Sequence, residues 1–280
     1  MTTDRATGHS AAIDTARTYY NSDDADTFYR TVWGGEDIHV GLYRDPGEDI
    51  ATASRRTVER MAELAGIGPD DTVLDLGAGY GGAARHLARA HGSSVHCLNL
   101  SEVENERNRE MTGEQGLADR ISVTDGAFEE LPFDDAAFDV VWSQDAFLHS
   151  ADRTRVIEEA TRVLRPGGRI VFTDPMAQVG VAPDALTPIL DRIQLETMAT
   201  PEFYLDTLAA AGANEITFEE HHEQLPTHYG RVLEELVDRE QELAGSVSTG
   251  YLTRMKAGLR HWVDGGRAGN LAWGIFRATT

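Results

Sequence analysis

The sequence predicts an α/β fold in which a parallel β-sheet is covered by helices. Between residues 70 and 175, short apolar runs alternate with longer amphipathic runs, which is the pattern of repeated β-α units. A glycine-rich turn, LDLGAGYGG (74–82), joins the first of these strands to the first of these helices. The 280-residue chain is long enough for one such domain with additional helical cover.

The N-terminal part of the chain carries little strand signal and is predicted to be helical. Helical patterns run over 11–20 and 26–33, and the second is followed by a glycine-broken stretch, WGGEDIHVGLY (33–43). A further helix is expected over 50–64. It should end near Gly66, because glycine readily adopts the left-handed conformation that closes a helix.

The strand–helix units come next. Strands are predicted over five short apolar runs, at 72–77, 94–100, 121–126, 138–143 and 169–175. Helices are predicted between them over 81–92, 102–116 and 152–164. Pro166 stops the last of these helices, since proline lacks the N–H that a helix interior needs.

Beyond residue 175 the regular alternation of predicted strands and helices ends. A loop and helix (176–212) precede a strand over 215–220, a mostly helical insert covers 221–265, and a final strand covers 270–279. The chain shows no internal repeat and no low-complexity linker. We therefore expect a core over 66–280 that carries the insert, with residues 1–65 forming a helical cover and substrate lid.

Charge is the strongest compositional signal. The 47 Asp and Glu residues against 25 Lys and Arg give a formal net charge of −22, and Lys256 is the single lysine. Such a chain is repelled by phosphate backbones, so nucleic acid is not expected as a partner. The acidic residues are spread along the chain. Adaptation to a high-salt cytoplasm, where ions screen the repulsion, is the favoured explanation, and a GC-rich genome is the alternative.

Two further features bear on compartment and partners. No apolar run approaches the ~20 residues that span a bilayer. The stretch MTTDRATGHS (1–10) has no apolar signal core, so the expected location is the cytoplasm, with no membrane partner. Cys97, the single cysteine, excludes an intramolecular disulfide and is expected to be a buried thiol. A monomer or homodimer is the expected assembly.

The glycine-rich turn predicts a cofactor site. Gly77, Gly79 and Gly82 satisfy the G-x-G-x-x-G spacing of dinucleotide-binding turns. A tight turn needs one glycine, whereas this one, with Gly81, has four, so we expect a ligand to approach the amides at the helix N-terminus. Asp75 favours S-adenosyl-L-methionine over a nicotinamide, because a carboxylate there can face the cationic amino group of the methionine moiety.

Two later motifs resemble those of a known superfamily. FEELPFDDAAFDVVWS (128–143) and RVLRPGGRIVFTDP (162–175) stand at the distances typical of the fourth and fifth strands of class I methyltransferases. Together with the glycine turn, they make the whole of 70–175 resemble that superfamily. The resemblance implies a Rossmann-like, seven-stranded sheet whose last strand is antiparallel. It also implies S-adenosyl-L-methionine as cofactor and S-adenosyl-L-homocysteine as its product.

The same resemblance assigns cofactor contacts to the ends of successive strands, with two departures. Asn99 stands where an acid usually holds the ribose, and Ala127 stands where an acid often recognises adenine. Glu102 and Glu104 are spare acids that we expect on a solvated helix face; Asp125 is an alternative adenine partner to the backbone of 126–128. The predicted cofactor-binding residues are Asp75, Gly77, Ala78, Gly79, Gly81, Asn99, Leu100, Ala127, Phe128, Ser143 and Gln144.

A closer resemblance runs the length of the chain. Its segments are 19–43, 74–82, LNLSEVENERNREM (98–111), WSQDAFLHS (142–150), TDPM (173–176), PILDRIQLETM (188–198), LPTHYGRV (225–232) and GLRHWVDGGRAGNLAWGIF (258–276). They are similar to the sarcosine/dimethylglycine N-methyltransferases of halophilic bacteria. The resemblance implies methyl transfer to the amine nitrogen of N,N-dimethylglycine, and also of sarcosine, which forms the osmoprotectant glycine betaine.

Other readings stay open at this point. A phosphoethanolamine- or tocopherol-type methyltransferase is the rival enzyme, because WGGEDIHVGLY has relatives there. A non-catalytic module that binds S-adenosyl-L-methionine is the rival from another class. A nicotinamide oxidoreductase is the least favoured.

The acceptor implied by the resemblance carries an ammonium group and a carboxylate. Aromatic faces suit the ammonium end and contribute ~0.5–2 kcal/mol each when desolvated. Tyr20, Trp33 and Tyr43 are the candidates, with ordinary packing as the alternative. A guanidinium suits the carboxylate through paired hydrogen bonds, and Arg192 is the candidate, with a structural ion pair to Asp191 or Glu196 as the alternative.

The predicted catalytic residues are His149, His39 and Tyr19. The two histidines are candidate bases, because an unperturbed imidazole titrates near ~6.5. A dry, cationic site could instead favour the neutral amine without a dedicated base. Asp145 is expected to face the acceptor. Direct methyl transfer requires no metal, so we interpret His221 and His222 as part of a solvated strand end.

Overall fold

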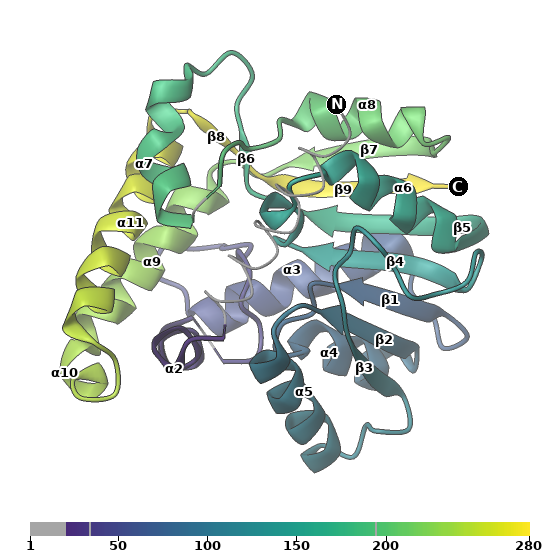
Figure 1. Ribbon diagram of the computed structural model, residues 1–280, viewed down its shortest axis with the longest axis horizontal. Helices are drawn as coiled ribbons and strands as arrows, with labels where there is room; N and C mark the ends of the chain where they lie inside the picture. Colours follow the sequence, from purple (N-terminus) through teal and green to yellow (C-terminus); the bar gives the residue numbers. More distant parts are fainter. Residues whose placement is uncertain (1–20, 34, 194) are drawn as a thin grey trace, which may run out of the picture.

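The computed structural model describes residues 21–33, 35–193 and 195–280, and its centre is a seven-stranded sheet (Figure 1). The strand order is β3-β2-β1-β4-β5-β9-β7. The strands are β1 (Thr72–Leu76), β2 (Ser94–Asn99), β3 (Ile121–Asp125), β4 (Phe138–Gln144), β5 (Leu164–Thr173), β7 (Asn214–Glu220) and β9 (Gly274–Thr279). Strands β1 to β5 pair in parallel, and β9 runs antiparallel to both β5 and β7. The predicted Rossmann-like α/β fold is confirmed.

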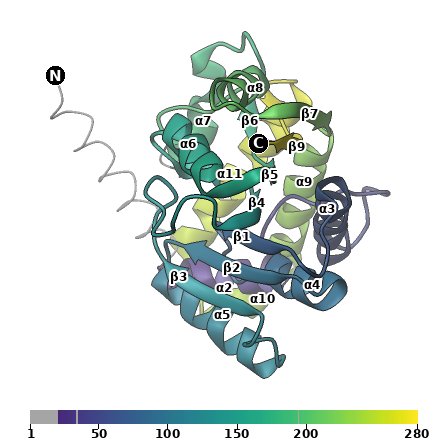
Figure 2. The ribbon, with the colours of Figure 1, turned by 90° about the vertical axis from the view of Figure 1, so that its right-hand side faces the viewer.

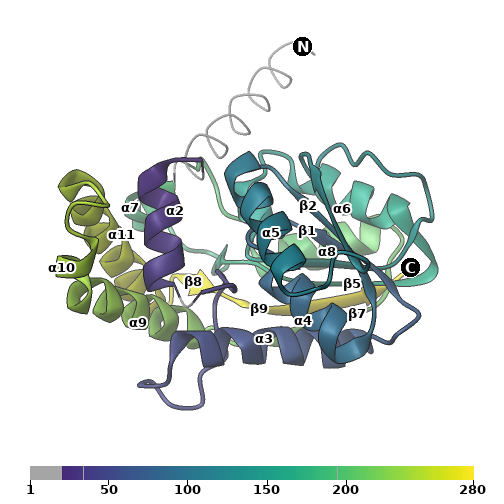
Figure 3. The ribbon, with the colours of Figure 1, turned by 90° about the horizontal axis from the view of Figure 1, so that it is seen from below.

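Helices cover both faces of this sheet (Figures 2 and 3). Helices α3 (Ile50–Ala65) and α4 (Gly82–His91) lie on one face, while α6 (Arg153–Val163) and α8 (Pro201–Ala210) lie on the other. Helix α5 (Glu102–Glu114) packs beside β2 and β3. The side chains of neighbouring strand residues point to opposite faces of the sheet. Val73 packs in the hydrophobic core under α3 and α4, whereas Leu74 packs in the core under α6 and α8.

Most predicted helix ends are confirmed, and one strand begins earlier than expected. Gly66 closes α3 in the left-handed conformation, with φ 62°, and α6 ends at Val163, before Pro166. The strand predicted from residue 169 instead starts at Leu164, because Leu164 already pairs with Phe138. The ladder then shifts register and resumes at Arg169, so the RPGG stretch is an irregularity within β5.

The C-terminal third is more divided than the sequence suggested. Residues 176–212 hold two helices, α7 (Pro183–Ile193) and α8, after a short strand, β6 (Met176–Ala177). The final strand is split into β8 (Leu271–Ala272), which pairs with β6, and β9, which joins the main sheet. Trp273 lies between the two halves, so its side chain sits where the chain passes from one sheet to the other.

A helical block lies beyond the carboxyl ends of the parallel strands (Figure 1). It contains α2 (Asp23–Val32), α7, α9 (Gln224–Asp238), α10 (Glu240–Leu243) and α11 (Thr249–Arg267). Aromatic contacts join its helices: Tyr229 stacks on Trp262 at 4.6 Å between ring centroids, and Phe28 meets Tyr251 at 5.9 Å. Across the described residues, no helix combines the length and apolar character needed to cross a bilayer. The helix predicted over 11–20 lies outside the described residues.

Helix α2 connects this block to the sheet through one carboxylate. Asp26 accepts hydrogen bonds from Arg107 Nε (3.0 Å) and Nη2 (2.9 Å) on α5, and from Tyr80 Oη (3.0 Å) in the glycine turn. Asp24, half a turn away, accepts from the backbone N–H and hydroxyl of Ser248 at 2.8 and 2.5 Å. Helix α2 is therefore held between the cofactor side of the core and the insert.

This arrangement predicts that Asp26→Asn loosens α2. The variant loses a paired, charge-assisted contact worth about 1–2 kcal/mol, so amide hydrogen exchange in α2 should be ~5–30-fold faster. Asp23→Asn is the matched control, because Asp23 is exposed in the same first helical turn. Equal exchange rates in the two variants would contradict the role given to Asp26.

Candidate active site

The glycine turn packs against the segment that follows β4. Gly77 and Ala78 donate their backbone N–H groups to Leu98 O at 2.8 and 3.3 Å. Gly77 has φ 76°, and a Cβ added there would overlap the Cβ of Ala146. Gly81 has φ 75°, and a Cβ there would overlap the Asn108 side chain. Gly77 and Gly81 therefore form part of a close-packed turn in which side chains at these positions would not fit.

Asp75, the next-to-last residue of β1, is a buried acid. Its Oδ2 has no hydrogen-bond partner among the described residues. Burial raises the pKa of its carboxyl to about 7, which His39 opposes and Asp37 reinforces. The Oδ1 of Asp37 is likewise buried; it makes no hydrogen bond within the described residues and lies 3.8 Å from His39 Nε2, whereas its Oδ2 pairs with Arg55 at 2.7 Å. A cation, such as the amino group of a methionine moiety, fits this pair of acceptors.

The first turn of α5 supplies, at the end of β2, an acid whose burial the sequence interpretation predicted wrongly. Glu104 does not lie on a solvated helix face; it is buried and accepts a hydrogen bond from Asn99 Nδ2 at 2.9 Å. Ser101 caps α5, and this brings the first helical turn back over the strand end. Burial raises the pKa of Glu104 to about 7. Glu102 is exposed, as expected, and accepts from Asn21 at 2.8 Å.

The segment after β3 carries the predicted adenine residues. Ala127 is half-buried, and Phe128 meets Phe147 edge-on at 5.8 Å. Asp125, the alternative partner, is already engaged: its Oδ1 accepts from Asn105 at 2.7 Å and its Oδ2 from Arg109 at 3.0 Å. The backbone N–H of Gly126 is also engaged, since it donates to Asn99 O at 3.1 Å.

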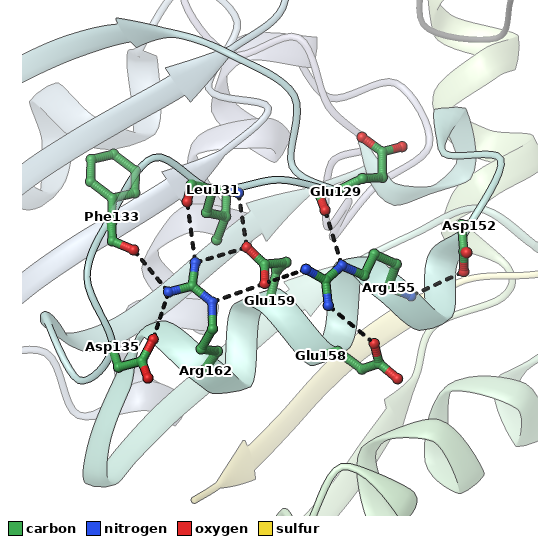
Figure 4. Close-up of polar contacts among 9 residues, drawn as sticks. All are labelled: Glu129, Leu131, Phe133, Asp135, Asp152, Arg155, Glu158, Glu159 and Arg162. Atoms are coloured by element: carbon green, nitrogen blue, oxygen red, sulfur yellow. Dashed lines mark hydrogen bonds and ion pairs between the residues drawn. The ribbon is translucent and has the colours of Figure 1, made fainter. Parts of the chain in front are cut away.

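An arginine–glutamate network fastens the loop beyond this segment to α6 (Figure 4). Arg162 donates to Leu131 O at 3.2 Å and to Phe133 O at 2.8 Å, and Glu159 accepts from Leu131 N at 2.9 Å. Glu129, at the start of the loop, accepts from Ser150 Oγ at 2.6 Å. Through Ser150 the network also holds the last residue of WSQDAFLHS.

Two predicted cofactor residues of WSQDAFLHS use their polar atoms differently. Ser143 donates its hydroxyl to Leu76 O at 2.7 Å, so this group joins β4 to β1. Gln144 accepts from Trp142 Nε1 at 3.1 Å, while its buried Nε2 has no partner among the described residues. Gln144 therefore keeps a donor available for a ligand at the carboxyl edge of the sheet.

Asp145 joins three distant parts of the chain. Its Oδ2 accepts from Val40 N and its Oδ1 from Trp273 Nε1, each at 2.7 Å. Its backbone N–H donates to Thr173 O at 2.9 Å, and its φ of 52° is unusual for a residue with a side chain. Burial raises the pKa of this carboxyl, and His39 and the two donors oppose that rise.

The two candidate bases lie in different surroundings. His39 is buried, with Nδ1 3.2 Å from Val40 O and Nε2 3.8 Å from Asp37 Oδ1. His149 ends a single 3₁₀ turn, η1 (Phe147–His149). Burial lowers its pKa to about 4, and the charges of Arg153 and Arg192 add to this effect. His149 is therefore neutral at physiological pH.

Arg192 lies against α11. A Cβ added to Gly258 would overlap the Arg192 side chain, and Arg192 Nη2 approaches Met255 Sδ at 3.7 Å. Because its charge also lowers the pKa of His149, Arg192 and His149 lie within electrostatic reach of one another.

The predicted aromatic residues are packed together with an unpredicted histidine. Tyr43 Oη lies 2.9 Å from His228 Nδ1, which also accepts from Gly41 N at 3.2 Å. Trp33 meets His228 edge-on at 5.4 Å. Burial lowers the pKa of His228 to about 3, so it stays neutral. Tyr19 and Tyr20 lie outside the described residues.

The sequence interpretation missed four residues of this region: Asp37, Asp174, His228 and Trp273. Asp174 could have been found, because it follows β5 at the same sheet edge where β1, with Asp75 as its next-to-last residue, also ends. Trp273 and His228 carry no local signal, because each acquires its role by contacting a segment more than 100 residues away.

Comparison with known proteins places this geometry in context. The family model described as a methyltransferase domain matches residues 74–172. The chain is 62% identical to a sarcosine/dimethylglycine N-methyltransferase of Halorhodospira halochloris over 95% of both chains. It is 60% identical, over 96% of its own length, to a glycine/sarcosine/dimethylglycine N-methyltransferase of Actinopolyspora halophila; it spans 48% of that protein.

A solved structure agrees. The crystal structure of a candidate sarcosine dimethylglycine methyltransferase from Galdieria sulphuraria superposes with a TM-score of 0.88 at 45% identity. The match covers 93% of this chain and 98% of the other, so the helical block is shared as well as the sheet.

The raised pKa of Asp75 predicts that cofactor affinity depends on pH. Below about pH 7 the free carboxyl holds a proton, and a ligand ammonium requires it to be lost. Binding of S-adenosyl-L-homocysteine should therefore tighten as pH rises from 6 to 8, by up to about tenfold per unit below the pKa, with proton release. Calorimetry in buffers of different ionisation enthalpy measures both quantities.

Asp75→Asn and Glu104→Gln separate the two buried acids. Asp75→Asn should weaken the binding of S-adenosyl-L-homocysteine and remove most of its pH dependence. Glu104→Gln should keep the pH dependence that arises from Asp75. A wild-type affinity that does not change between pH 6 and 8 would contradict the assignment of Asp75 to the ammonium.

Proposed function

Since the chain belongs to the sarcosine/dimethylglycine N-methyltransferase family of S-adenosyl-L-methionine-dependent enzymes, we propose that it methylates the amine nitrogen of N,N-dimethylglycine, and of sarcosine, to form glycine betaine. The observation that supports this most is the single stretch from Gln144 to His149. It packs against the glycine turn through Ala146, carries a buried donor at Gln144, and ends in a neutral imidazole within electrostatic reach of Arg192.

S-Adenosyl-L-methionine, when bound, supplies an electrophilic methyl group on a sulfonium sulfur. Asp75 and Asp37 hold its ammonium, the glycine turn accommodates its chain, and Asn99 with Glu104 holds the ribose hydroxyls. Leu100, Ala127 and Phe128 flank the adenine. Gln144 Nε2, which has no hydrogen-bond partner within the described part of the chain, can donate to the methionine end. These residues orient the ligand, and orientation with desolvation is the main source of acceleration in a direct displacement.

Arg192 binds the acceptor's carboxylate through its guanidinium fork. Trp33 and Tyr43 are assigned to the ammonium side, where aromatic faces favour a quaternary nitrogen. Tyr20, assigned to the same role from the sequence, lies outside the described residues. Asp145 faces the same nitrogen from the core. The acceptor is thereby held with its carboxylate toward a cation and its nitrogen toward a carboxylate, which suits a zwitterion.

The amine must lose its proton before its lone pair can attack the methyl carbon. We assign proton removal to His39, which is buried and whose Nε2 lies 3.8 Å from Asp37 Oδ1. His149, with its pKa lowered to about 4, is neutral and accepts a hydrogen bond from the ammonium N–H of dimethylglycine before that proton is lost, or from the remaining N–H of neutral sarcosine. Tyr19 completes the proposed catalytic set. The displaced electron pair remains on sulfur, and the proton leaves through His39.

The proposal also includes the protein's location, its assembly and its acceptor. We assign it to the cytoplasm as a monomer or homodimer, with a small amino acid as its acceptor. Residues 1–65 act as cover and lid on the 66–280 core. Accumulated betaine would balance the osmotic stress of the high-salt interior that the net charge of −22 suits.

Methyl-transfer assays with glycine, sarcosine, dimethylglycine and phosphoethanolamine test the function directly. We expect turnover of dimethylglycine and sarcosine, and none of phosphoethanolamine, because its phosphate would face an acidic lid. Tight cofactor binding with no turnover of sarcosine or dimethylglycine would sink the proposal.

Arg192→Lys tests the acceptor's carboxylate site. The variant keeps the charge but loses the fork, so the KM for dimethylglycine should rise ~10–100-fold, the equivalent of about 1.5–3 kcal/mol. The affinity for S-adenosyl-L-homocysteine should not change. Arg260→Lys, an exposed position on α11, is the matched control. If both variants have the wild-type KM, the carboxylate binds elsewhere.

A further inference from the structure

Asp174 is a buried acid that the proposed mechanism does not use. It directly follows β5 and is fully buried. The layer around it is built from large apolar and aromatic side chains, including Phe147, Phe172 and Tyr204. Burial raises the pKa of its carboxyl to about 7, although Tyr204, Arg153 and the Leu148 N–H oppose that rise. An isolated carboxylate is costly in such surroundings, so its two hydrogen bonds deserve an explanation.

Both carboxylate oxygens are engaged. Oδ1 accepts from the backbone N–H of Leu148 at 2.9 Å, and Oδ2 accepts from Tyr204 Oη at 2.7 Å. Leu148 lies in the η1 turn and immediately precedes His149. Tyr204 comes from α8, on the same face of the sheet as α6.

The η1 turn needs an outside acceptor. A single 3₁₀ turn satisfies few of its own donors: His149 N donates to Ala146 O at 3.1 Å and Ser150 N to Phe147 O at 3.0 Å. The residue before the turn, Ala146, provides no side-chain cap. The N–H groups at the start of any helical turn require acceptors, and Asp174 is the acceptor for Leu148.

The other end of the same residue is also held. Arg153 Nη2 donates to Leu148 O at 2.7 Å and to Thr197 O at 2.8 Å. Leu148 therefore has its N–H bound by an acid from β5 and its C=O bound by an arginine from α6. The position of the turn is set by two elements outside it, and the local sequence of the turn cannot supply this constraint.

We infer that Asp174 is a positioning residue for methyl transfer: it caps the η1 turn from the end of β5 and fixes where His149 meets the acceptor amine. This inference rests on the proposed function for its kinetic readout. The structural part of the inference, that Asp174 sets the position of the η1 turn, holds whatever the substrate is.

The test compares Asp174→Ala with Asp174→Asn. Alanine removes the cap, so kcat per S-adenosyl-L-homocysteine-binding site should fall ~100-fold or more, while the affinity for that ligand stays within about threefold. Asparagine keeps an acceptor for Leu148 without the charge, so kcat should fall only ~3–10-fold. Asp206→Asn, an exposed acid on α8, is the matched control and should behave as wild type.

The normalisation to binding sites separates positioning from folding. A purely structural Asp174 would lower the yield of binding-competent protein and leave kcat per site unchanged, which would overturn the inference. If Asp174→Ala gives no binding-competent protein, Asp174→Asn decides: a reduced kcat per site supports the inference, and a wild-type value overturns it.

Amide hydrogen exchange at residues 147–149 keeps this test distinct from the test of function. Exchange in Asp174→Asn should be faster than in wild type at these amides and unchanged at the glycine turn. If wild type methylates neither sarcosine nor dimethylglycine, the proposed function fails, and faster exchange still supports the capping role. Unchanged exchange at 147–149 contradicts that role whatever the substrate.

Discussion

The buried carboxylate of Asp145 is the constraint on which the rest of the site depends. It receives one N–H from the N-terminal segment, at Val40, and one from the indole of Trp273, near the C-terminus. A buried charge that loses a donor is penalised by several kcal/mol, so both segments are strongly held to the end of β4. The backbone of Asp145 adopts a left-handed φ of 52°. This conformation costs on the order of 1–3 kcal/mol, which the surrounding contacts offset.

This junction explains how a small-molecule site is assembled from distant parts of the chain. Val40 follows His39, and Gln144 precedes Asp145, so closing the junction sets the candidate base beside the cofactor side of the sheet. The η1 turn that begins two residues later is held separately, by Asp174 and Arg153. Catalysis by placement requires such independent supports, because displacement of the amine by about 1 Å costs much of the rate.

The parts of this architecture that the sequence predicts are those with local causes. Alternating apolar runs predict the strands, and Gly66, Gly92 and Pro166 mark helix ends through their own backbone preferences. The missed parts depend on tertiary contact. The interruption of the last strand at Trp273 follows from its bond to Asp145, and the burial of Glu104 follows from the return of α5 over β2. Neither contact can be inferred from the amino-acid composition of those segments.

The most direct test of the central claim is the KM for dimethylglycine of Trp273→Phe. This change removes one N–H, 2.7 Å from Asp145 Oδ1, and keeps an aromatic ring in place. If Asp145 is held for the acceptor by its two donors, KM should rise ~10–100-fold, with the affinity for S-adenosyl-L-homocysteine within about twofold of wild type. A wild-type KM in a folded, cofactor-binding variant would contradict the account, because the junction would then have no bearing on where the acceptor binds.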